Sequence, residues 1–481
     1  MMEIMVVLGG FGLIAFWLWI IVRWRVGFIG LLVFLPYAGI ISLKFHSMKE
    51  MLVLKDFLFV LPAYASFFFF HRRDLKLAPM PKPILMAIGC LALLVVLQSM
   101  NPHIPNFLVP AIGIKVWLFY IPLAFLAAAY VNSREDLSRL LRLLILLSII
   151  PCCVGLLQWF GAMTYGFEGT METFYGNAET ARAATSNFSY NQYGGKLFRI
   201  PATFTFVSQY FGYTMGMVVI GYCTMRSDVS RTWRKFGFLM IGFYIVSSAL
   251  SGARGALVFI PLLLVVMALL DRRLSGILGV VISIPVMILA ALHFGGLDPT
   301  IVFGETSKLV TSYSSDLVIG NVIEAFHRYP LGAGTGMNTG AARHAYASEE
   351  QAFSVIPYWV ETYYAKAIVE LGFIGLVVVC VMFIVIIVKG FAVLSSLKDI
   401  ALRSCASALL GFLIVIAVHS GKGWQIDYDP LNIYFWIFVG ILFKLNTLDG
   451  TTPELSVSRK RRSATTRIPQ PAASGRTVRR F

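Results

Sequence analysis

Charged residues are scarce in this sequence. Asp, Glu, Lys and Arg make up 13% of its 481 residues, whereas soluble domains carry about 25%. This scarcity excludes a soluble globular enzyme, and a hydrophobic fraction of 58% excludes a disordered chain. The same composition excludes a secreted disulfide scaffold. The six cysteines all fall inside apolar runs and form no CxxC pair, which is typical of small core residues and carries no information about disulfides.

Long apolar runs are abundant instead. A helix needs about 20 apolar residues to cross a bilayer, and we therefore expect an all-α polytopic membrane protein with about thirteen transmembrane helices. The first run is closely followed by a second and lacks a small-residue cleavage site, which indicates a retained span rather than a signal peptide. The expected spans cover residues 4–22, 26–43, 52–70, 83–100, 107–131, 137–160, 203–224, 236–252, 255–270, 275–294, 363–388, 404–420 and 431–445.

Two long connections and a polar tail complete the expected organisation. Apolar residues at helical spacing over 314–329 predict a helix inside the second connection. The parts are N-terminal transmembrane helices (1–160), a first extracytoplasmic loop (161–202), central transmembrane helices (203–294), a large, partly helical extracytoplasmic loop (295–362), C-terminal transmembrane helices (363–445) and a disordered basic cytoplasmic tail (446–481).

The loops alternate in basic content, and this alternation predicts the orientation. One set of loops, with the tail, holds 26 Lys and Arg, and the other holds 10 although it contains both long loops. The positive-inside rule places the first set in the cytoplasm, with the N-terminus outside. The net charge of +16 then favours contact with anionic lipid of the inner leaflet. Binding to nucleic acid is not expected, because no soluble folded domain carries the charge.

Alternating glycines form a candidate anion site in the second long loop. Gly332, Gly334 and Gly336 lie in the segment PLGAGTGMN, which ends at Asn338. Glycine permits positive φ and close backbone approach, and successive N–H groups can bind an anion such as a diphosphate. A plain structural turn is the alternative. Without a preceding strand the pattern is not a dinucleotide fingerprint.

Three cations lie at or near membrane boundaries. Arg254 stands in a connection so short that its side chain must point into the bundle or into a polar cavity, unless it is a snorkelling anchor. Arg199 precedes the span that begins near residue 203 and is either a site residue or an interfacial anchor. Lys115 lies inside an apolar run, and is either a site residue or a buried lysine paired with an acid such as Asp56.

Two carboxylates accompany the span 363–388. Glu361 lies at its outer end and is a candidate general base. Tyr363 belongs to the aromatic group around it, which is either part of the substrate site or the ordinary interfacial belt. Glu370 lies four residues after Lys366, a spacing that predicts a structural ion pair within one helix.

Further basic residues lie in the large loop. Arg328, Arg343 and His344 are candidate substrate-binding residues. His327 and His344 have no third ligand at metal-binding spacing, so we expect neither a metal nor another cofactor. The sequence has no GxSxG motif to support a serine hydrolase.

Four segments together resemble the O-antigen ligase and Wzy-type polysaccharide polymerase superfamily. Members of this superfamily are bacterial inner-membrane glycosyltransferases with a GT-C-like fold. They take glycans from undecaprenyl diphosphate at the periplasmic face without a metal. The segments, in chain order, are FRIPATFTFVSQYFGY (198–213), SGARGA (251–256), YPLGAGTGMN (329–338) and ETYYAKAIVELGFIGL (361–376).

The resemblance implies roles for particular residues. Arg199 and Arg254 correspond to arginines that hold the leaving diphosphate, where a guanidinium pairs with phosphate oxygens. Glu361 stands where ligases usually have His and where polymerases tolerate Glu, which favours a polymerase. Ser315 and Asp316 stand where the family has another arginine, which leaves Arg328 and Arg343 as candidates to replace it.

The expected function is polymerisation of undecaprenyl-diphosphate-linked oligosaccharide repeat units into an exported polysaccharide. The partners would be the lipid-linked donor, a glycan acceptor and membrane lipid, together with a flippase and a chain-length regulator. The alternatives are an O-antigen ligase or O-oligosaccharyltransferase of the same superfamily, and a transporter or flippase. Inverted repeats with broken spans would favour transport, and no such symmetry is visible in the sequence.

Overall fold

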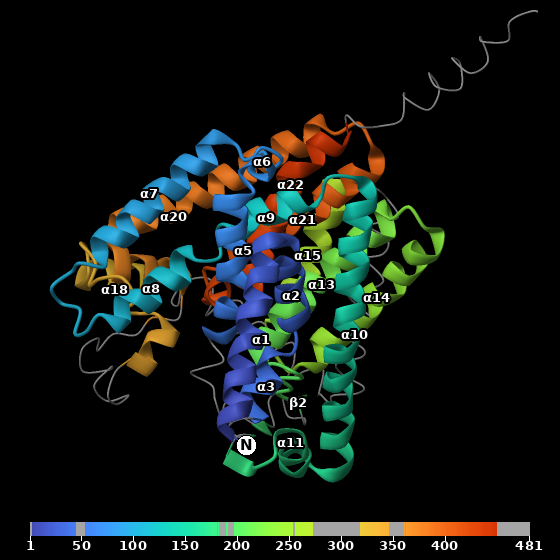
Figure 1. Cartoon of the computed structure of the whole chain (residues 1–481), viewed down its shortest axis with the longest axis horizontal. Helices are drawn as coiled ribbons and strands as arrows, with labels where there is room; N and C mark the ends of the chain where they lie inside the picture. Colours follow the sequence, from blue (N-terminus) through green and yellow to red (C-terminus); the bar gives the residue numbers. More distant parts are fainter. Residues whose placement is uncertain are drawn as a thin grey trace, which may run out of the picture.

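The chain folds into a bundle of helices (Figure 1). The computed structural model describes residues 2–44, 53–179, 181, 189–190, 197–253, 255–272, 318–345, 360 and 362–449. The only sheet within these residues is the antiparallel pair β1 (Ser189–Tyr190) and β2 (Leu197–Phe198). The helices of the first half are α1 (Met2–Val22), α2 (Trp24–Phe34), α3 (Ala38–Lys44), α5 (Leu61–Ala65), α6 (Arg72–Leu75), α7 (Lys82–Gln98), α8 (Leu108–Leu118), α9 (Leu123–Tyr130), α10 (Arg134–Tyr165) and α11 (Phe167–Tyr175).

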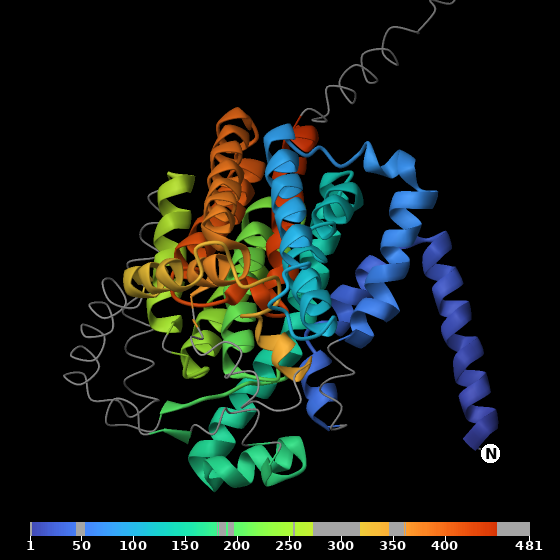
Figure 2. The same ribbon diagram turned by 90° about the vertical axis from the view of Figure 1, so that its left-hand side faces the viewer.

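The second half continues the bundle. Its helices are α13 (Val207–Ser227), α14 (Arg231–Leu250), α15 (Ala256–Asp271), α18 (Val318–Arg328), α20 (Tyr363–Ser396), α21 (Ile400–His419) and α22 (Leu431–Asp449). Figure 2 shows α1 at the edge of the bundle and α18 lying across the direction of the long helices. The helix expected within 314–329 is therefore present as α18.

Six helical segments are long and apolar enough to cross a membrane, which is consistent with a multi-pass membrane protein. A seventh is counted if α2 and the end of α1, which meet at 117°, form one broken span. The six are Val53–Phe70, Leu108–Tyr130, Arg134–Tyr165, Tyr363–Ser396, Ile400–His419 and Leu431–Asp449.

The described residues do not reach the expected thirteen spans. The runs 4–22 and 26–43 do not form two full spans, because only Gly12–Val22 and Trp24–Phe34 make up the bent pair and the second run continues into the separate helix α3. Helices α7 and α15 have only 17 and 16 residues. Helices α13 and α14 are long enough but are not among the apolar segments that could span a membrane. The run 275–294 lies outside the described residues.

The connections gather at two ends of the bundle. The basic loops contact one another at one end, which we call the basic end, and the connections of the other set meet at the opposite end, the loop end. This grouping is the one that the charge alternation predicts. At the basic end the contacts are Trp24–Asp74, Lys444–Leu77, Arg134–Asp399, Arg142–Asp228 and Arg226–Asp271. At the loop end they are Lys55–Asp429, Ile200–Ser251, Tyr363–Ser420 and Asn106–Ala345.

Helix α20 is broken at Gly372, which has φ +75° and ψ −176°. The glycine turn 330–338 fits into this break. The N–H groups of Ala333 and Gly334 donate to the carbonyls of Val369 and Glu370, at 2.6 and 3.2 Å. Backbone groups that the break removes from the helix thus find partners in the turn. Gly332, Gly334 and Gly336 have the positive φ that glycine permits, at +86°, +116° and +90°.

Candidate functional site

Arg199 lies beside the turn that joins α14 to α15. The N–H of Ile200 donates to the carbonyl of Ser251 at 2.9 Å. At Gly252, where φ is +70°, a Cβ atom would lie 3.2 Å from the Cα of Arg199. Arg254 lies two positions further on and is outside the described residues. The fold therefore brings Arg199 together with the turn that leads to Arg254.

Buried polar contacts fix the segment that follows Arg199. Gln158 accepts the N–H of Ala202 at 2.9 Å and donates to its carbonyl at 3.1 Å. The hydroxyl of Tyr175 donates to the same carbonyl at 2.8 Å. Ala202 has φ +53°, a conformation that a non-glycine residue keeps only where its surroundings enforce it. The backbone next to Arg199 is therefore held in one conformation.

Four ionisable residues form a cluster at the loop end. Lys115 Nζ lies 2.7 Å from Asp56, and Lys55 Nζ lies 2.7 Å from Asp429 and 3.5 Å from Asp56. The hydroxyl of Tyr120 donates to Asp56 at 2.9 Å. The structure thus confirms the alternative in which Lys115 pairs with Asp56. The two lysines and two aspartates balance in charge. This matters because a buried charge without a partner of opposite sign is strongly destabilising.

A small cavity of about 40 Å³ connects this cluster to the Arg199 segment. Lys55 and Asp429 lie on one side of it, and Phe204, Thr205 and Gln209 line it as well. Gln209 accepts hydrogen bonds from the N–H and the hydroxyl of Thr205, at 3.0 and 2.6 Å. The ion cluster and the segment after Arg199 are therefore neighbours.

Glu370 is completely buried and lies at the break of α20. Its Oε2 accepts the indole N–H of Trp117 at 2.7 Å and the backbone N–H of Gly336 at 2.8 Å. Its Oε1 accepts the N–H of Asn338 at 3.0 Å and the hydroxyl of Thr339 at 2.8 Å. Each of the two carboxylate oxygens therefore accepts two hydrogen bonds.

The glycine turn therefore serves the protein's own groups. Gly336 and Asn338 donate to Glu370, and Thr335 N–H donates to the carbonyl of Gln98 at 3.1 Å. Every backbone N–H from Gly332 to Asn338 has an acceptor inside the protein. This arrangement favours the structural alternative for the turn over direct binding of a diphosphate.

Lys366 is fully buried and forms an ion pair with Asp427. The Nζ atom also lies 3.9 Å from Glu370, as the spacing predicts, and 4.7 Å from the ring centre of Trp117. Burial raises the pKa of Asp427 to about 6, against the opposing influence of Lys366. Tyr363 is buried in the same group, with its ring centre 5.3 Å from that of Trp117.

The other candidate residues are separate from these groups or undescribed. Arg328 pairs with Glu324 at 2.6 Å, and both side chains are about half exposed. Arg343 and His344 lie in the short helix Gly340–Ala345, where the positions of their side chains are not described. Glu361 is outside the described residues and directly precedes Thr362, which caps α20 by accepting the N–H of Ala365.

Sequence reasoning missed Lys55, Asp427, Asp429 and Trp117. A signal was present for the ionisable residues. Charged groups near the boundary of apolar runs need partners of opposite sign, and Lys55, Asp427 and Asp429 are such residues. Sequence separations of 61 between Lys366 and Asp427, and of 253 between Trp117 and Glu370, concealed the pairings.

The described part of the chain contains no group of three His, Cys, Asp or Glu residues that could hold a metal ion. No family model matches the chain, and no curated protein matches it.

Proposed function

We propose that this protein is a membrane glycosyltransferase that polymerises undecaprenyl-diphosphate-linked oligosaccharide repeat units. The observation that carries the proposal is the contact between Arg199 and the turn leading to Arg254. Arg254 follows this turn in the sequence, and two guanidinium groups suit a diphosphate, because each pairs bidentately with phosphate oxygens. The resemblance gives the same two residues this role.

The reaction needs little more than these groups and a base. The acceptor hydroxyl attacks the anomeric carbon of the donor, and a new carbon–oxygen bond forms. The bond from that carbon to the diphosphate oxygen breaks, and undecaprenyl diphosphate leaves with the electron pair. Arg199 and Arg254 stabilise its charge, and Glu361 takes the proton of the hydroxyl.

The buried groups of α20 support this assignment by positioning. Glu361 stands next to the cap residue Thr362, and the first two turns of α20 end at Glu370. Glu370 ties these turns to the glycine turn and to Trp117 on α8. In the proposed mechanism Gly332, Gly334, Gly336 and Asn338 therefore hold the base in place rather than contact the donor.

The decisive experiment measures turnover per folded molecule in proteoliposomes that contain lipid-linked repeat units. We expect Arg199→Lys, Arg254→Lys and Glu361→Gln each to lose most chain growth, because lysine lacks the planar fork of arginine and an amide is not a base. Arg231→Lys is the control, since Arg231 is exposed and begins α14 at the basic end.

Each product pattern has one interpretation. Ladders of growing length support a polymerase, whereas single transfer to an acceptor would assign a ligase. Movement of intact donor across the bilayer without a new glycosidic bond would assign a transporter. Normal chain growth by all three variants would refute the proposed site.

A further inference from the structure

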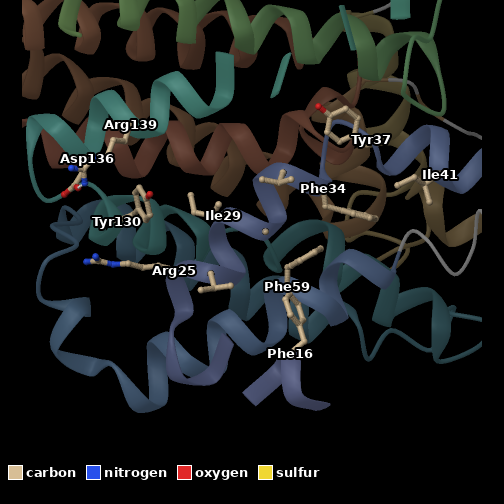
Figure 3. A pocket seen from close by; sticks show the side chains of 13 residues that line it. Phe16, Arg25, Ile29, Phe34, Tyr37, Ile41, Phe59, Tyr130, Asp136 and Arg139 are labelled. Carbon is tan, nitrogen blue, oxygen red and sulfur yellow. Dashed lines mark ion pairs between the residues drawn. The ribbon is translucent and has the colours of Figure 1, made fainter. Parts of the chain in front are cut away.

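An open groove of about 850 Å³ runs along one side of α2 (Figure 3). The polar part of its lining lies at the basic end and consists of Arg25, Tyr130, Asp136 and Arg139. The remainder is almost entirely apolar. Figure 3 shows the charged side chains together at one end and the aromatic and aliphatic side chains towards the other. The groove therefore has a charged end and an apolar end.

We propose that this groove binds one anionic phospholipid of the membrane leaflet at the basic end. Its phosphate would lie between Arg25 and Arg139, and an acyl chain would lie along Ile29, Val33 and Phe34. The proposal does not depend on the glycosyltransferase activity, because none of these residues belongs to the proposed reaction.

The length of the groove along α2 matches the thickness of one membrane leaflet. Arg25 and Phe34 are nine residues apart and both lie within the single helix α2. This corresponds to about 14 Å along the axis, close to half of the roughly 30 Å hydrocarbon core of a bilayer. An acyl chain that starts at the two arginines thus reaches Phe34 within one leaflet.

The charges select the head group. Arg139 lies 3.7 Å from Asp136, and its side chain remains 73% exposed. Asp136 also accepts the backbone N–H of Asn132 at 3.2 Å. Its carboxylate therefore interacts both with the backbone before α10 and with Arg139. Arg25 is exposed and lies over the ring of Trp24, 5.6 Å from its centre. The polar end of the groove therefore has a net positive charge. It suits a phosphate head group that carries no ammonium group.

The groove is open and mostly apolar, which suits a lipid. Helix α1 supplies Phe16, and α2 supplies most of the apolar residues, on the side of the bundle that Figure 2 shows at the edge. A zwitterionic lipid would bring an ammonium group next to two arginines. An anionic head group avoids this repulsion and is attracted by the other basic residues of the same end.

Native mass spectrometry of the full chain in detergent, titrated with phosphatidylglycerol, tests the proposal. We expect wild-type protein to prefer phosphatidylglycerol to phosphatidylethanolamine. We expect Arg25→Gln/Arg139→Gln to bind phosphatidylglycerol about 25-fold more weakly, because each of the two basic residues near anionic lipid contributes roughly fivefold. Arg72→Gln/Arg73→Gln is the matched control, since these exposed arginines begin α6 and do not line the groove.

A second variant tests the apolar half without changing charge. Val33→Trp places a large ring in the groove and should weaken binding of the same lipid severalfold, while its total charge stays that of wild type. It also covers the case in which the double arginine variant does not fold. Equal loss in the Arg72/Arg73 control would indicate general attraction to a basic surface and overturn the proposal. Equal affinity of wild-type protein for both lipids would overturn it as well.

Discussion

The backbone N–H of Gly336 donates to the carboxylate of Glu370 at 2.8 Å, across 34 residues of chain. This bond joins the glycine turn to the point where α20 is broken. The glycine turn and the buried residue Glu370, each a weak signal in the sequence, therefore belong to one structural unit. The predictions below test that unit, its neighbour Asp427 and the two ends of the bundle.

Glu370→Gln should destabilise the protein by about 3 kcal/mol. The substitution replaces one carboxylate oxygen by an amide NH₂ group, so the two donors that face this oxygen lose their acceptor. A buried donor without an acceptor costs about 1–3 kcal/mol. The loss of the negative charge also removes a partner of buried Lys366. The measurement is the midpoint of thermal unfolding in detergent.

Glu324→Gln is the matched control for this change. Glu324 pairs with Arg328 on the surface of α18, and both side chains are about half exposed. An exposed pair of this kind contributes about 0–1 kcal/mol. The interpretation of Glu370 fails if both variants unfold at the same temperature as wild type.

Gly336→Ala should strongly destabilise the protein. The new Cβ would lie 2.2 Å from the carbonyl oxygen of Val109, in a residue with φ +90°. Strained φ alone costs about 1–3 kcal/mol. The control is Gly320→Ala on α18, where a Cβ meets no atom within 4 Å. We expect low yield of folded protein for the first variant and wild-type yield for the second, measured by size-exclusion chromatography.

Asp427 should make stability depend on pH between about 4 and 6. Its pKa in the folded protein is raised to about 6 by burial, so the folded state binds a proton that the unfolded state releases near pH 4. The contribution of the residue to stability is therefore present below pH 4 and is lost as the pH rises through 6. A rise of this size corresponds to about 3 kcal/mol.

Asp427→Asn removes this titration. The difference in unfolding free energy between wild type and the variant should change across pH 4–6 and be constant above pH 7. The groups that face Asp427 are Lys366 and Glu370. A difference that is independent of pH over the whole range would show that the carboxyl titrates in its ordinary range in the folded protein.

The two ends of the bundle should lie on opposite sides of the membrane. In a variant without the native cysteines, Thr173→Cys on α11 should react with an impermeant thiol reagent added to intact spheroplasts. Lys398→Cys, next to the start of α21, should react only after the membrane is opened. Both side chains are exposed. Labelling of Lys398→Cys alone would reverse the orientation that the loop charges predict.

Composition and hydropathy were sufficient for the class of the protein. Apolar runs determine where helices form, because a backbone that leaves water must satisfy its own hydrogen bonds. The alternation of basic loops predicted which connections meet at one end, and the glycines of the turn indicated a segment where positive φ is permitted. Both properties depend on residues close together in the sequence, and the structure confirms both.

The number of spans was less predictable. Apolar runs of similar appearance became a long helix in α10, a bent pair in α1 and α2, and helices of 16 and 17 residues in α15 and α7. Hydropathy registers the apolar character of a run but not where its helix bends or ends. Those limits depend on how neighbouring helices pack.

The sequence by itself determined that Glu370 would be buried and would lie one helical turn from Lys366. Only the tertiary structure decided that its close partners are Trp117, Gly336, Asn338 and Thr339, and that the close partner of Lys366 is Asp427. The physical reason is that burial follows from the hydropathy of neighbouring residues. The choice of a partner follows from which donors the packed helices bring to the same depth.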